Sequence, residues 1–285
     1  MEKKRLRIGF IGFGEVAQVL SGRMIEKGGE IVAYDKFPDR VSKKAEEQNV
    51  PLVKSLEELA VSCPLILSCL WPTAALNIAR EVAPLLSPEI IYCDMNSISP
   101  ETTSQIDLAV SSKGADFVKL AIMAAVLDRG YAVPILAGGG KAAEVAQILC
   151  DLGLNIQVMG RDPSQPAALK ILRSVCLKGV VALAYEMLRG AEKYGITEQV
   201  FESASEAMSK ASFKDTVGGW LASTAIHAKR RAGEMAEVIE TLEAAGIRPV
   251  MAAGTKEIFE EIASLGLDEA LDGSIPSSLD LILKK

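Results

Sequence analysis

The sequence of 285 residues is poor in the side chains from which metal sites and hydrolytic triads are built. It contains one histidine, His227, and five cysteines, none of them in a Cys-x-x-Cys pair. The cysteines are expected to be buried free thiols, and no dedicated metal site is expected. A Ser-His-Asp hydrolase would depend on that one histidine, and no Gly-x-Ser-x-Gly segment is present to expose a serine. Metal and serine-hydrolase chemistry are therefore disfavoured.

Long apolar runs are also scarce. The best candidate for a membrane span, between Ile171 and Leu188, is interrupted by Lys178, so no membrane-spanning helix is expected. The basic start, Lys3 to Arg5, leads directly into a strand pattern and is not a secretory signal. A net charge of −6 disfavours general nucleic-acid or anionic-membrane binding, although a local basic pocket can still bind an anion. We expect a cytoplasmic protein with a small-molecule ligand.

Two domains are expected from the length and from a change of pattern at Pro163. Before this point, apolar strand patterns alternate with helical ones, which implies a parallel, doubly wound α/β sheet. After it, helical patterns continue, with interruptions near Gly246, Gly266 and Gly273. The predicted domains are residues 1–162 and 163–285. The expected strands after the first two are Leu65–Cys69, Ile90–Cys93, Ala115–Leu120, Val133–Ala137 and Leu154–Val158.

A glycine-rich turn follows the first apolar run. Gly12 permits a tight turn, Gly14 lets the backbone approach a phosphate, and Ala17 allows close packing of helix on strand. Free amides at the start of the helix would face the anion. The segment therefore predicts a dinucleotide site, and its cofactor-binding residues are expected to be Gly12, Phe13, Gly14, Glu15 and Val16.

Asp35 ends the second expected strand, Glu30 to Asp35, and lies 21 residues after Gly14. A carboxylate at this place can accept hydrogen bonds from an adenosine ribose and repels a 2′-phosphate. NAD is therefore favoured, with NADP possible because Lys36 could contact a phosphate. Asp35 could also be only an acidic turn residue.

Ligands of such sheets bind at the carboxyl ends of the strands, so the loops that follow two further strands are candidates. The first contains Leu70, Trp71 and Pro72. In the second, Asn96 and Ser97 could face the nicotinamide, while Ser99 and Pro100 are expected to begin a helix as its N-cap and first residue. For Asn96, turn formation is an equally good interpretation.

A long helix is expected from Gln165 to Lys193, apolar nearly all round and therefore central and buried. Lys170, Ser174 and Lys178 lie along one face of it. Burial lowers the pKa of a lysine toward the range useful for proton transfer, so this face is interpreted as a site wall. The alternative is that both lysines reach solvent or pair with carboxylates.

A basic patch in the C-terminal half places His227, Arg230, Arg231 and Glu234 on one helix face. Such a face can bind a carboxylate or phosphate, or it can be a solvated, salt-bridged surface.

Three segments together resemble the β-hydroxyacid dehydrogenase and 6-phosphogluconate dehydrogenase superfamily: Gly12 to Ala17, Asp94 to Pro100, and Lys170 early in the long helix. The element His227 to Met235, of the form His-Ala-x-Arg-Arg-x-x-Glu-Met, is similar to a poorly characterised branch of it. The resemblance implies a Rossmann-type doubly wound domain, an all-α second domain through which a homodimer forms, and a catalytic lysine at Lys170.

The chain departs from this superfamily at three places. Met123, Ala124 and Ala125 stand where hydroxyacid dehydrogenases have a Ser-Gly-Gly substrate loop. Arg173 and Ser174 replace two asparagines, and Leu177 replaces the glutamate of decarboxylating members. Oxidative decarboxylation of 6-phosphogluconate is therefore disfavoured.

The sequence predicts an NAD(P)-dependent dehydrogenase or reductase that acts on the CH–OH group, or the corresponding oxo group, of a small polar anionic compound. Lys170 is the expected general acid/base, and Ser174 and Asn96 complete the catalytic set. An imine-type reductase and a catalytically inactive NAD(P)-binding sensor stay open as alternatives. The expected substrate-binding residues are Met123, Arg173, Lys178, His227 and Arg230.

Overall fold

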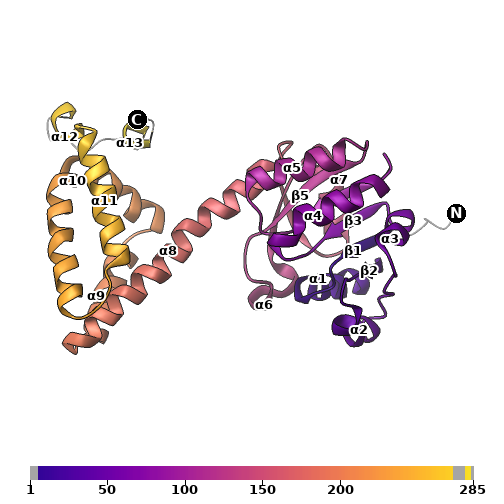
Figure 1. Cartoon of the computed structure of the whole chain (residues 1–285), viewed down its shortest axis with the longest axis horizontal. Helices are drawn as coiled ribbons and strands as arrows, with labels where there is room; N and C mark the ends of the chain where they lie inside the picture. The colour runs from indigo at the N-terminus through magenta and orange to yellow at the C-terminus, as the bar shows by residue number, and fades with distance from the viewer. Residues whose placement is uncertain (1–5, 272–279, 284–285) are drawn as a thin grey trace. The chain divides into compact units, whose positions relative to one another are not determined.

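The computed structural model describes residues 6–271 and 280–283 of the chain (Figure 1). Contacts between residues divide the chain into two compact units, unit 1 (Met1–Val175) and unit 2 (Cys176–Lys285), which are described separately. The basic start, Lys3 to Arg5, and Gly273 lie outside the described residues.

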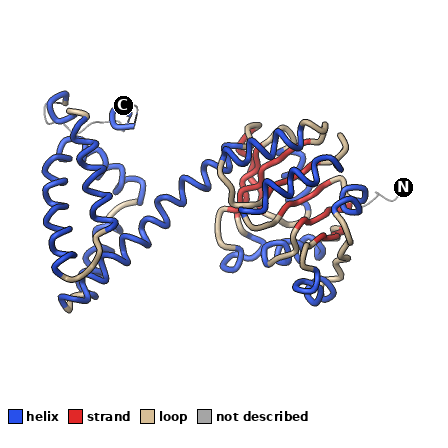
Figure 2. Tube along the Cα trace, viewed as in Figure 1, coloured by secondary structure: helices blue, strands red, loops and turns tan. Residues whose placement is uncertain are grey.

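Unit 1 is built on a seven-stranded sheet with the strand order β2-β1-β3-β4-β5-β6-β7. The strands are the red segments in Figure 2. The order runs outward from β1 in both directions, as in a doubly wound sheet, so the predicted fold class is confirmed. The expected strands are all present, with ends displaced by one or two residues. They are β1 (Arg7–Ile11), β2 (Glu30–Tyr34), β3 (Leu65–Ser68), β4 (Ile91–Asp94), β5 (Asp116–Ile122), β6 (Pro134–Gly138) and β7 (Asn155–Gly160).

One strand pair departs from the expected parallel arrangement. β5 and β6 are antiparallel, while the other neighbouring pairs are parallel. The connection between these two strands holds only α6 (Val126–Arg129) and a 3-10 turn (Gly130–Ala132), which is too short for a crossover to a parallel strand. The sheet is therefore mixed, with β6 and β7 reversed.

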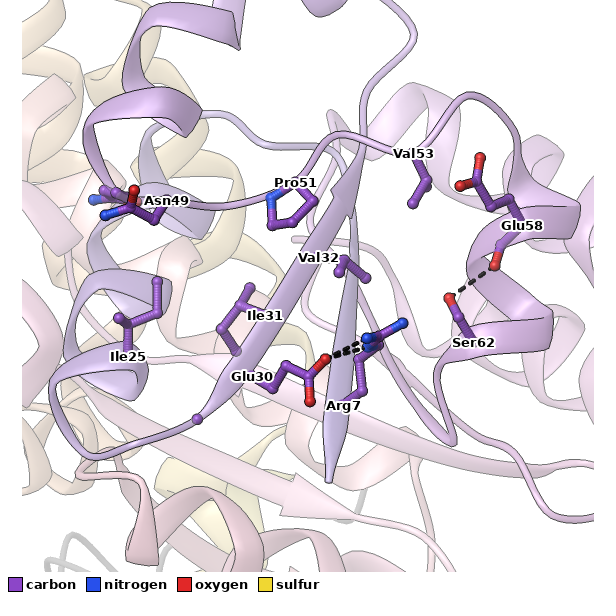
Figure 3. A pocket seen from close by; sticks show the side chains of 12 residues that line it. Arg7, Ile25, Glu30, Ile31, Val32, Asn49, Pro51, Val53, Glu58 and Ser62 are labelled. Carbon is purple, nitrogen blue, oxygen red and sulfur yellow. Dashed lines mark hydrogen bonds and ion pairs between the residues drawn. The ribbon is translucent and has the colours of Figure 1, made fainter. Parts of the chain in front are cut away.

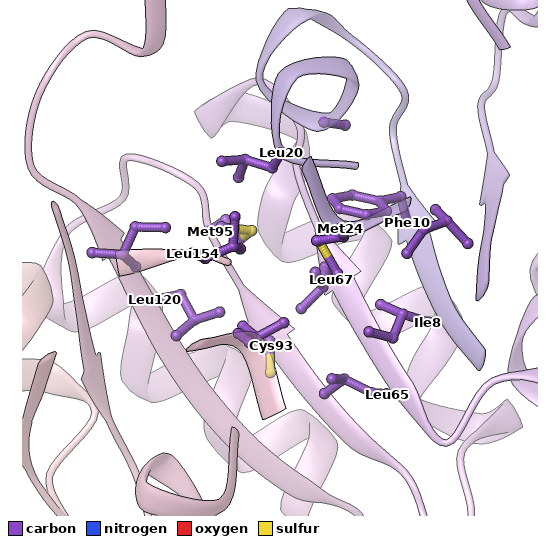
Figure 4. Packing of buried hydrophobic residues seen from close by; sticks show 14 of the residues in the cluster. Ile8, Phe10, Leu20, Met24, Leu65, Leu67, Cys93, Met95, Leu120 and Leu154 are labelled. Carbon is purple, nitrogen blue, oxygen red and sulfur yellow. The ribbon is translucent and has the colours of Figure 1, made fainter. Parts of the chain in front are cut away.

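Helices cover both faces of the sheet because alternate side chains of the strands are apolar on both sides. Ile8 and Phe10 of β1 point into one core, together with Leu20 and Met24 of α1 (Figure 4). Ile11 of β1 belongs to a second core on the other face. The first core is covered by α1 (Glu15–Glu26), α2 (Pro38–Glu47) and α7 (Ala142–Asp151), and the second by α3 (Leu56–Ser62), α4 (Pro72–Val82), a 3-10 turn (Ala83–Leu85) and α5 (Pro100–Ser111).

The long helix α8 (Ser164–Tyr194) has nearly the predicted extent. Its first turns belong to unit 1: Ala167 is buried, and a Cβ added at Gly138 of β6 would lie 2.7 Å from the ring of Pro166. The division by contacts therefore falls after Val175, inside α8, whereas the domain boundary expected after residue 162 falls before this helix.

The expectation that α8 is buried on all sides is wrong for a single chain. Leu172, Val175 and Val181 are 67, 72 and 69% exposed. An apolar pattern all round a helix indicates that every face meets apolar surface, but it does not say whether that surface belongs to the same chain.

Unit 2 is helical throughout its described part, as predicted. Gly246 and Gly266 adopt left-handed conformations with φ of +73° and +62°, and each ends a helical segment where the sequence places an interruption. Besides the second part of α8, the helices are α9 (Thr197–Ser209), α10 (Phe213–Ala244), α11 (Val250–Ser264), α12 (Leu267–Ala270) and α13 (Asp280–Leu283).

The start of α11 is capped by a side chain from α8. The carboxylate oxygens of Glu186 accept hydrogen bonds from the backbone N–H groups of Met251 and Ala252, both at 2.8 Å. The residue before the helix, Pro249, makes no side-chain cap of its own. Glu186, which is buried, therefore satisfies amides that a helix end otherwise leaves unpaired.

The cysteines are free thiols in the structure. Cys63 and Cys93 are buried as expected and Cys69 and Cys176 are half-buried, but Cys150 is exposed.

Candidate functional site

The turn between β1 and α1 has a geometry that requires glycine at its first position. Gly12 has a φ of +87°, and a Cβ there would lie 2.5 Å from the carbonyl oxygen of Cys69. Gly14 differs: it is exposed, and nothing lies within 4 Å of the place that its Cβ would occupy. Gly14 is also the N-cap of α1, and no side chain caps the amides that follow. The start of α1 is therefore an open backbone surface suited to an anion.

The other residues expected in this turn have different surroundings. Phe13 is completely buried in the first core, and its backbone N–H and C=O are already paired with the side chains of Asp35 and Gln18. Glu15 is exposed and Val16 is half-buried.

Asp35 joins the glycine turn to the loop that follows β2. Its two carboxylate oxygens accept hydrogen bonds from the N–H groups of Phe13 and Phe37, each at 2.8 Å. Asp35 is therefore a turn-forming residue, and it is still half-exposed. A carboxylate oxygen that accepts one hydrogen bond has capacity for another, so ribose binding stays compatible with this geometry. Lys36, next to it, is exposed.

Asn96 lies at the carboxyl edge of the sheet, and its side chain is fully engaged. The amide nitrogen donates to Asp94 Oδ2 at 2.6 Å and to Ser68 Oγ at 3.2 Å, and the amide oxygen accepts from the N–H of Leu70 at 2.5 Å. Asn96 is buried. Its side chain therefore connects the ends of β3 and β4 and fixes the loop that carries Leu70.

A buried ion pair that the sequence analysis missed lies beside Asn96. Lys119 of β5 donates from Nζ to Asp94 Oδ1 and to the Asn96 carbonyl, the latter at 2.6 Å. Both charged side chains are almost completely inaccessible. The signal in the sequence is a lysine inside an apolar strand pattern, at the end where parallel strands bind ligands.

Lys170, on the first part of α8, faces this same edge. Burial, together with the charge of Lys119, lowers the pKa of Lys170 to about 8, and the Asp94 carboxylate opposes this shift. Cys69 also lies near it, and burial of its thiol raises the pKa of that group to about 12. Lys170 is therefore an amine that changes charge close to neutral pH in a partly dry environment.

Two neighbours of Lys170 on α8 make contacts of their own. Ser174 Oγ donates to the Lys170 carbonyl at 3.0 Å, one turn earlier in the helix, and its oxygen can still accept a hydrogen bond. Arg173 donates to the carbonyl of Met123, which is buried in the loop after β5. The structure thus brings Met123 and Arg173 together, and Ala124 and Ala125 continue this loop toward the surface.

The remaining expected cofactor residues of unit 1 lie in the loops that follow β3 and β4 or at the start of α4. Trp71 is 82% exposed, Pro72 and Ser97 are exposed, and Leu70 is half-buried. Ser99 accepts from the Thr102 N–H at 3.1 Å and Pro100 is the first residue of α5, so their predicted capping role is confirmed.

Three expected substrate residues lie in unit 2. Lys178 of α8 and His227 of α10 are exposed, and Arg230 forms an ion pair with Glu234 one turn further along α10. Arg231, from the same basic patch, donates to Ser223 Oγ at 3.0 Å and to Thr224 Oγ1, so it mainly braces its own helix.

A pocket of about 510 Å³ in unit 1 lies away from this edge (Figure 3). It is lined by Arg7 and Glu30, which form an ion pair at the amino ends of β1 and β2, and by apolar side chains such as Ile31 and Pro51. Because ligands of doubly wound sheets bind at the carboxyl ends of strands, the edge that carries Gly12, Asp94 and Lys170 is the better candidate. Among the described residues, no group of three or more His, Cys, Asp or Glu side chains could hold a metal ion.

This fold and this site define a class of protein: a dinucleotide-binding α/β domain followed by a helical domain. The family model for the NAD-binding domain of 6-phosphogluconate dehydrogenase matches residues 7–160, and that for a domain of unknown function, DUF1932, matches residues 191–262. The chain belongs to the 6-phosphogluconate dehydrogenase NAD-binding family. The resemblance read from the sequence is confirmed at this level, and with it the NAD(P)-binding type of the first domain.

The chain is also similar to individual proteins in sequence and in structure. A conserved hypothetical protein of Sinorhizobium meliloti is 34% identical, with 91% of this chain and 89% of that one covered and a TM-score of 0.63. A 2-(hydroxymethyl)glutarate dehydrogenase of Eubacterium barkeri is 22% identical over 70% of this chain and 68% of its own length. An imine reductase of Aspergillus terreus is 16% identical over 99% of both chains with a TM-score of 0.76, which shows a shared fold. The chain therefore belongs to a family of NAD(P)-binding proteins that includes hydroxyacid dehydrogenases.

No described helix combines the length and the apolarity that a bilayer crossing requires.

Proposed function

We propose that this protein is an NAD(P)-dependent oxidoreductase that interconverts a small anionic hydroxy compound and its oxo form, with Lys170 as the general acid/base. The observation that carries the proposal is the position of Lys170 at the carboxyl edge of the sheet, where its pKa is lowered to about 8. A group that gains and loses a proton near neutral pH is suited to proton transfer.

The residues at this edge fit a dinucleotide. Gly14 and the uncapped start of α1 would hold the diphosphate, and Asp35 would accept from the adenosine ribose. Leu70, Trp71 and Ser97 would line the path toward the nicotinamide, and Asn96 would keep their two loops in place. The dinucleotide, when bound, supplies or accepts the hydride.

The polar groups around Lys170 have separate tasks. The Lys170 Nζ would take the hydroxyl proton of the substrate during oxidation and return it during reduction. Ser174 would orient the substrate oxygen through the acceptor capacity of its hydroxyl. Arg173 fixes the Met123 loop and would contribute positive charge for an anionic group, with Lys178, His227 and Arg230 as further candidates for that task.

Cofactor choice can be tested at Asp35. The Asp35→Ser variant is expected to raise the affinity ratio of NADP to NAD about tenfold, which corresponds to ~1.4 kcal/mol, because the carboxylate no longer repels a 2′-phosphate. Titration calorimetry with both cofactors measures the ratio. Asp39→Ser removes a nearby exposed carboxylate of α2 as the matched control. An unchanged ratio in Asp35→Ser would show that Asp35 only holds the turn.

The exposed apolar side chains of α8 support a second proposal, that the chain forms a homodimer through its helical domain. Leu177 and Val181 are 56 and 69% exposed, and apolar surface of this kind is typical of subunit contacts. Light scattering is expected to give twice the chain mass for the wild type and the mass of one chain for Leu177→Glu/Val181→Glu. Val61→Glu, at an isolated exposed position on α3, is expected to leave the mass unchanged. A monomeric wild type would refute the dimer.

The loop at Met123 to Ala125 is also compatible with a second reaction, the reduction of an imine. Met123, Ala124 and Ala125 offer no side-chain group to anchor a carboxylate, and the fold is shared with an imine reductase. In that reaction Lys170 would donate its proton to nitrogen.

The substrate class can be tested by turnover. The purified protein is supplied with NADH or NADPH and with separate panels of oxo acids, sugar acids and cyclic imines. We expect turnover of anionic oxo compounds. Turnover of imines alone would favour the reductase, and tight NADH binding without any turnover would favour a dinucleotide sensor.

A further inference from the structure

Lys119 is a completely buried lysine that the proposed reaction does not use. It lies on β5 and ranks among the largest fully buried side chains of the described residues. A buried ammonium group is costly unless it is paired, so its surroundings indicate what it does.

The polar contacts of the Lys119 side chain are made with two residues at the carboxyl end of β4, Asp94 and Asn96. Its Nζ donates to Asp94 Oδ1 and to the Asn96 carbonyl, and Lys119 and Asp94 are direct neighbours in the register of β4 and β5. Asp94 in turn accepts from the backbone N–H of Asn96 at 3.1 Å and from its side-chain amide at 2.6 Å. The pair therefore fixes the segment that begins the loop carrying Asn96 and Ser97.

The same pair faces Lys170. The charged and titratable groups around the Lys170 amine come from four elements: Cys69 follows β3, Asp94 ends β4, Lys119 lies on β5, and Arg173 lies on α8 itself. The Cys69 thiol is neutral at physiological pH because burial raises its pKa to about 12. Asp94 attracts the protonated form of Lys170, whereas Lys119 and Arg173 repel it, and the effect of Lys119 is the largest of these charges.

We propose that Lys119, held by Asp94, is a positioning residue that sets the electrostatic environment of Lys170 and fixes the loop at the carboxyl end of β4. The proposal rests on the proposed role of Lys170 in proton transfer. Burial lowers the pKa of Lys119, and the ion pair with Asp94 opposes that shift by favouring the ammonium form. This second ammonium favours the neutral amine of Lys170, which is the form able to take a proton from a hydroxyl group. Stability alone does not require this pair, because buried ion pairs can be replaced by neutral side chains of similar volume at little cost.

The test measures the titration of Lys170 in the protein without cofactor. Competitive labelling with acetic anhydride, quantified for each lysine by mass spectrometry, gives the pH midpoint of its reactivity. The wild-type midpoint is expected at about 8. In Lys119→Met it is expected to move upward by ~1 pH unit, because the repelling charge is gone.

Two further variants control for loss of the fold and for removal of a lysine elsewhere in unit 1. Lys119→Met/Asp94→Asn removes both charges and leaves no unpaired buried ion, so it is expected to keep the wild-type fold. Because the two charges act on Lys170 in opposite directions and the effect of Lys119 is the larger, the midpoint is expected to rise by less than in Lys119→Met. Lys141→Met removes an exposed, ion-paired lysine of the same unit and is expected to leave the midpoint unchanged. Circular dichroism shows which variants are folded.

A midpoint within ~0.2 pH units of the wild type in folded Lys119→Met, or a midpoint below that of the wild type in the double variant, would overturn the proposal. The labelling result is independent of turnover, so the two proposals can fail separately. If the midpoint moves but no substrate is turned over, the electrostatic role stands and the proposed function falls. If turnover occurs, its pH profile is expected to shift in parallel with the labelling midpoint, and an unshifted profile would also count against the role of Lys119.

Discussion

Replacement of Lys170 by Met is expected to lower kcat by about 10²–10⁴-fold, the usual contribution of a positioned general acid or base. Dinucleotide affinity is expected to stay near that of the wild type, because the proposed diphosphate contacts come from the turn at Gly14 and not from α8. Steady-state kinetics and calorimetric titration with NADH measure the two quantities.

Lys170→Arg separates charge from proton transfer. The guanidinium keeps the positive charge but does not release a proton at any working pH, so this variant should lose as much activity as Lys170→Met. In the wild type, oxidation is expected to rise with pH through about 8 because the base must be neutral, and reduction to fall over the same range because the acid must be protonated. A Lys170→Met enzyme with most of its kcat would exclude the proposed role.

Replacement of Gly12 by Ala is expected to abolish dinucleotide binding and to destabilise unit 1 by at least about 1–3 kcal/mol. The new Cβ would lie 2.5 Å from the Cys69 carbonyl oxygen at a φ of +87°, so both the contact and the backbone conformation are unfavourable. Thermal unfolding followed by circular dichroism, together with NADH titration, checks both effects.

Gly14→Ala is the informative partner of this variant. Nothing lies within 4 Å of its Cβ position, so the protein should unfold at the wild-type temperature and yet bind the dinucleotide more weakly, because a methyl group would occupy the surface left for the phosphates. Gly140→Ala, at another open position, should change neither property. Wild-type NADH affinity in Gly14→Ala would mean that the turn serves packing only.

The fold could be predicted from the sequence largely because its signals are local. Gly12 and Gly14 mark the turn, the apolar runs mark the strands, and Ser99 with Pro100 marks the start of α5, each within a few residues. The reversal of β6 was missed because it depends on the length of one connection, between Ile122 and Pro134, and not on any strand pattern.

The site was less accessible to sequence reasoning because its contacts join distant segments. Asp35 was recognised by its spacing from Gly14, but its bond to the Phe13 amide requires the three-dimensional turn. Lys119 lies between apolar residues of a strand, and only the register of β4 and β5 brings its counter-ion, Asp94, beside it.

The apolar pattern of α8 shows a different limit. It predicted the helix and its extent correctly but not its burial in one chain, since residues such as Val175 are exposed. Sequence periodicity reports that a face is apolar, and the identity of the surface that covers it is a separate question.

The cap that Glu186 provides to α11 limits where a fragment of the helical domain can begin. The segment matched as a domain of unknown function spans residues 191–262, so it contains α10 and most of α11 but excludes Glu186. A fragment cut at those limits would leave the amides of Met251 and Ala252 without their acceptor and would lack the part of α8 that supplies it. The segment matched by the family model is therefore shorter than the unit that folds together. An expression fragment of the helical domain should start upstream of Glu186, at or before Cys176.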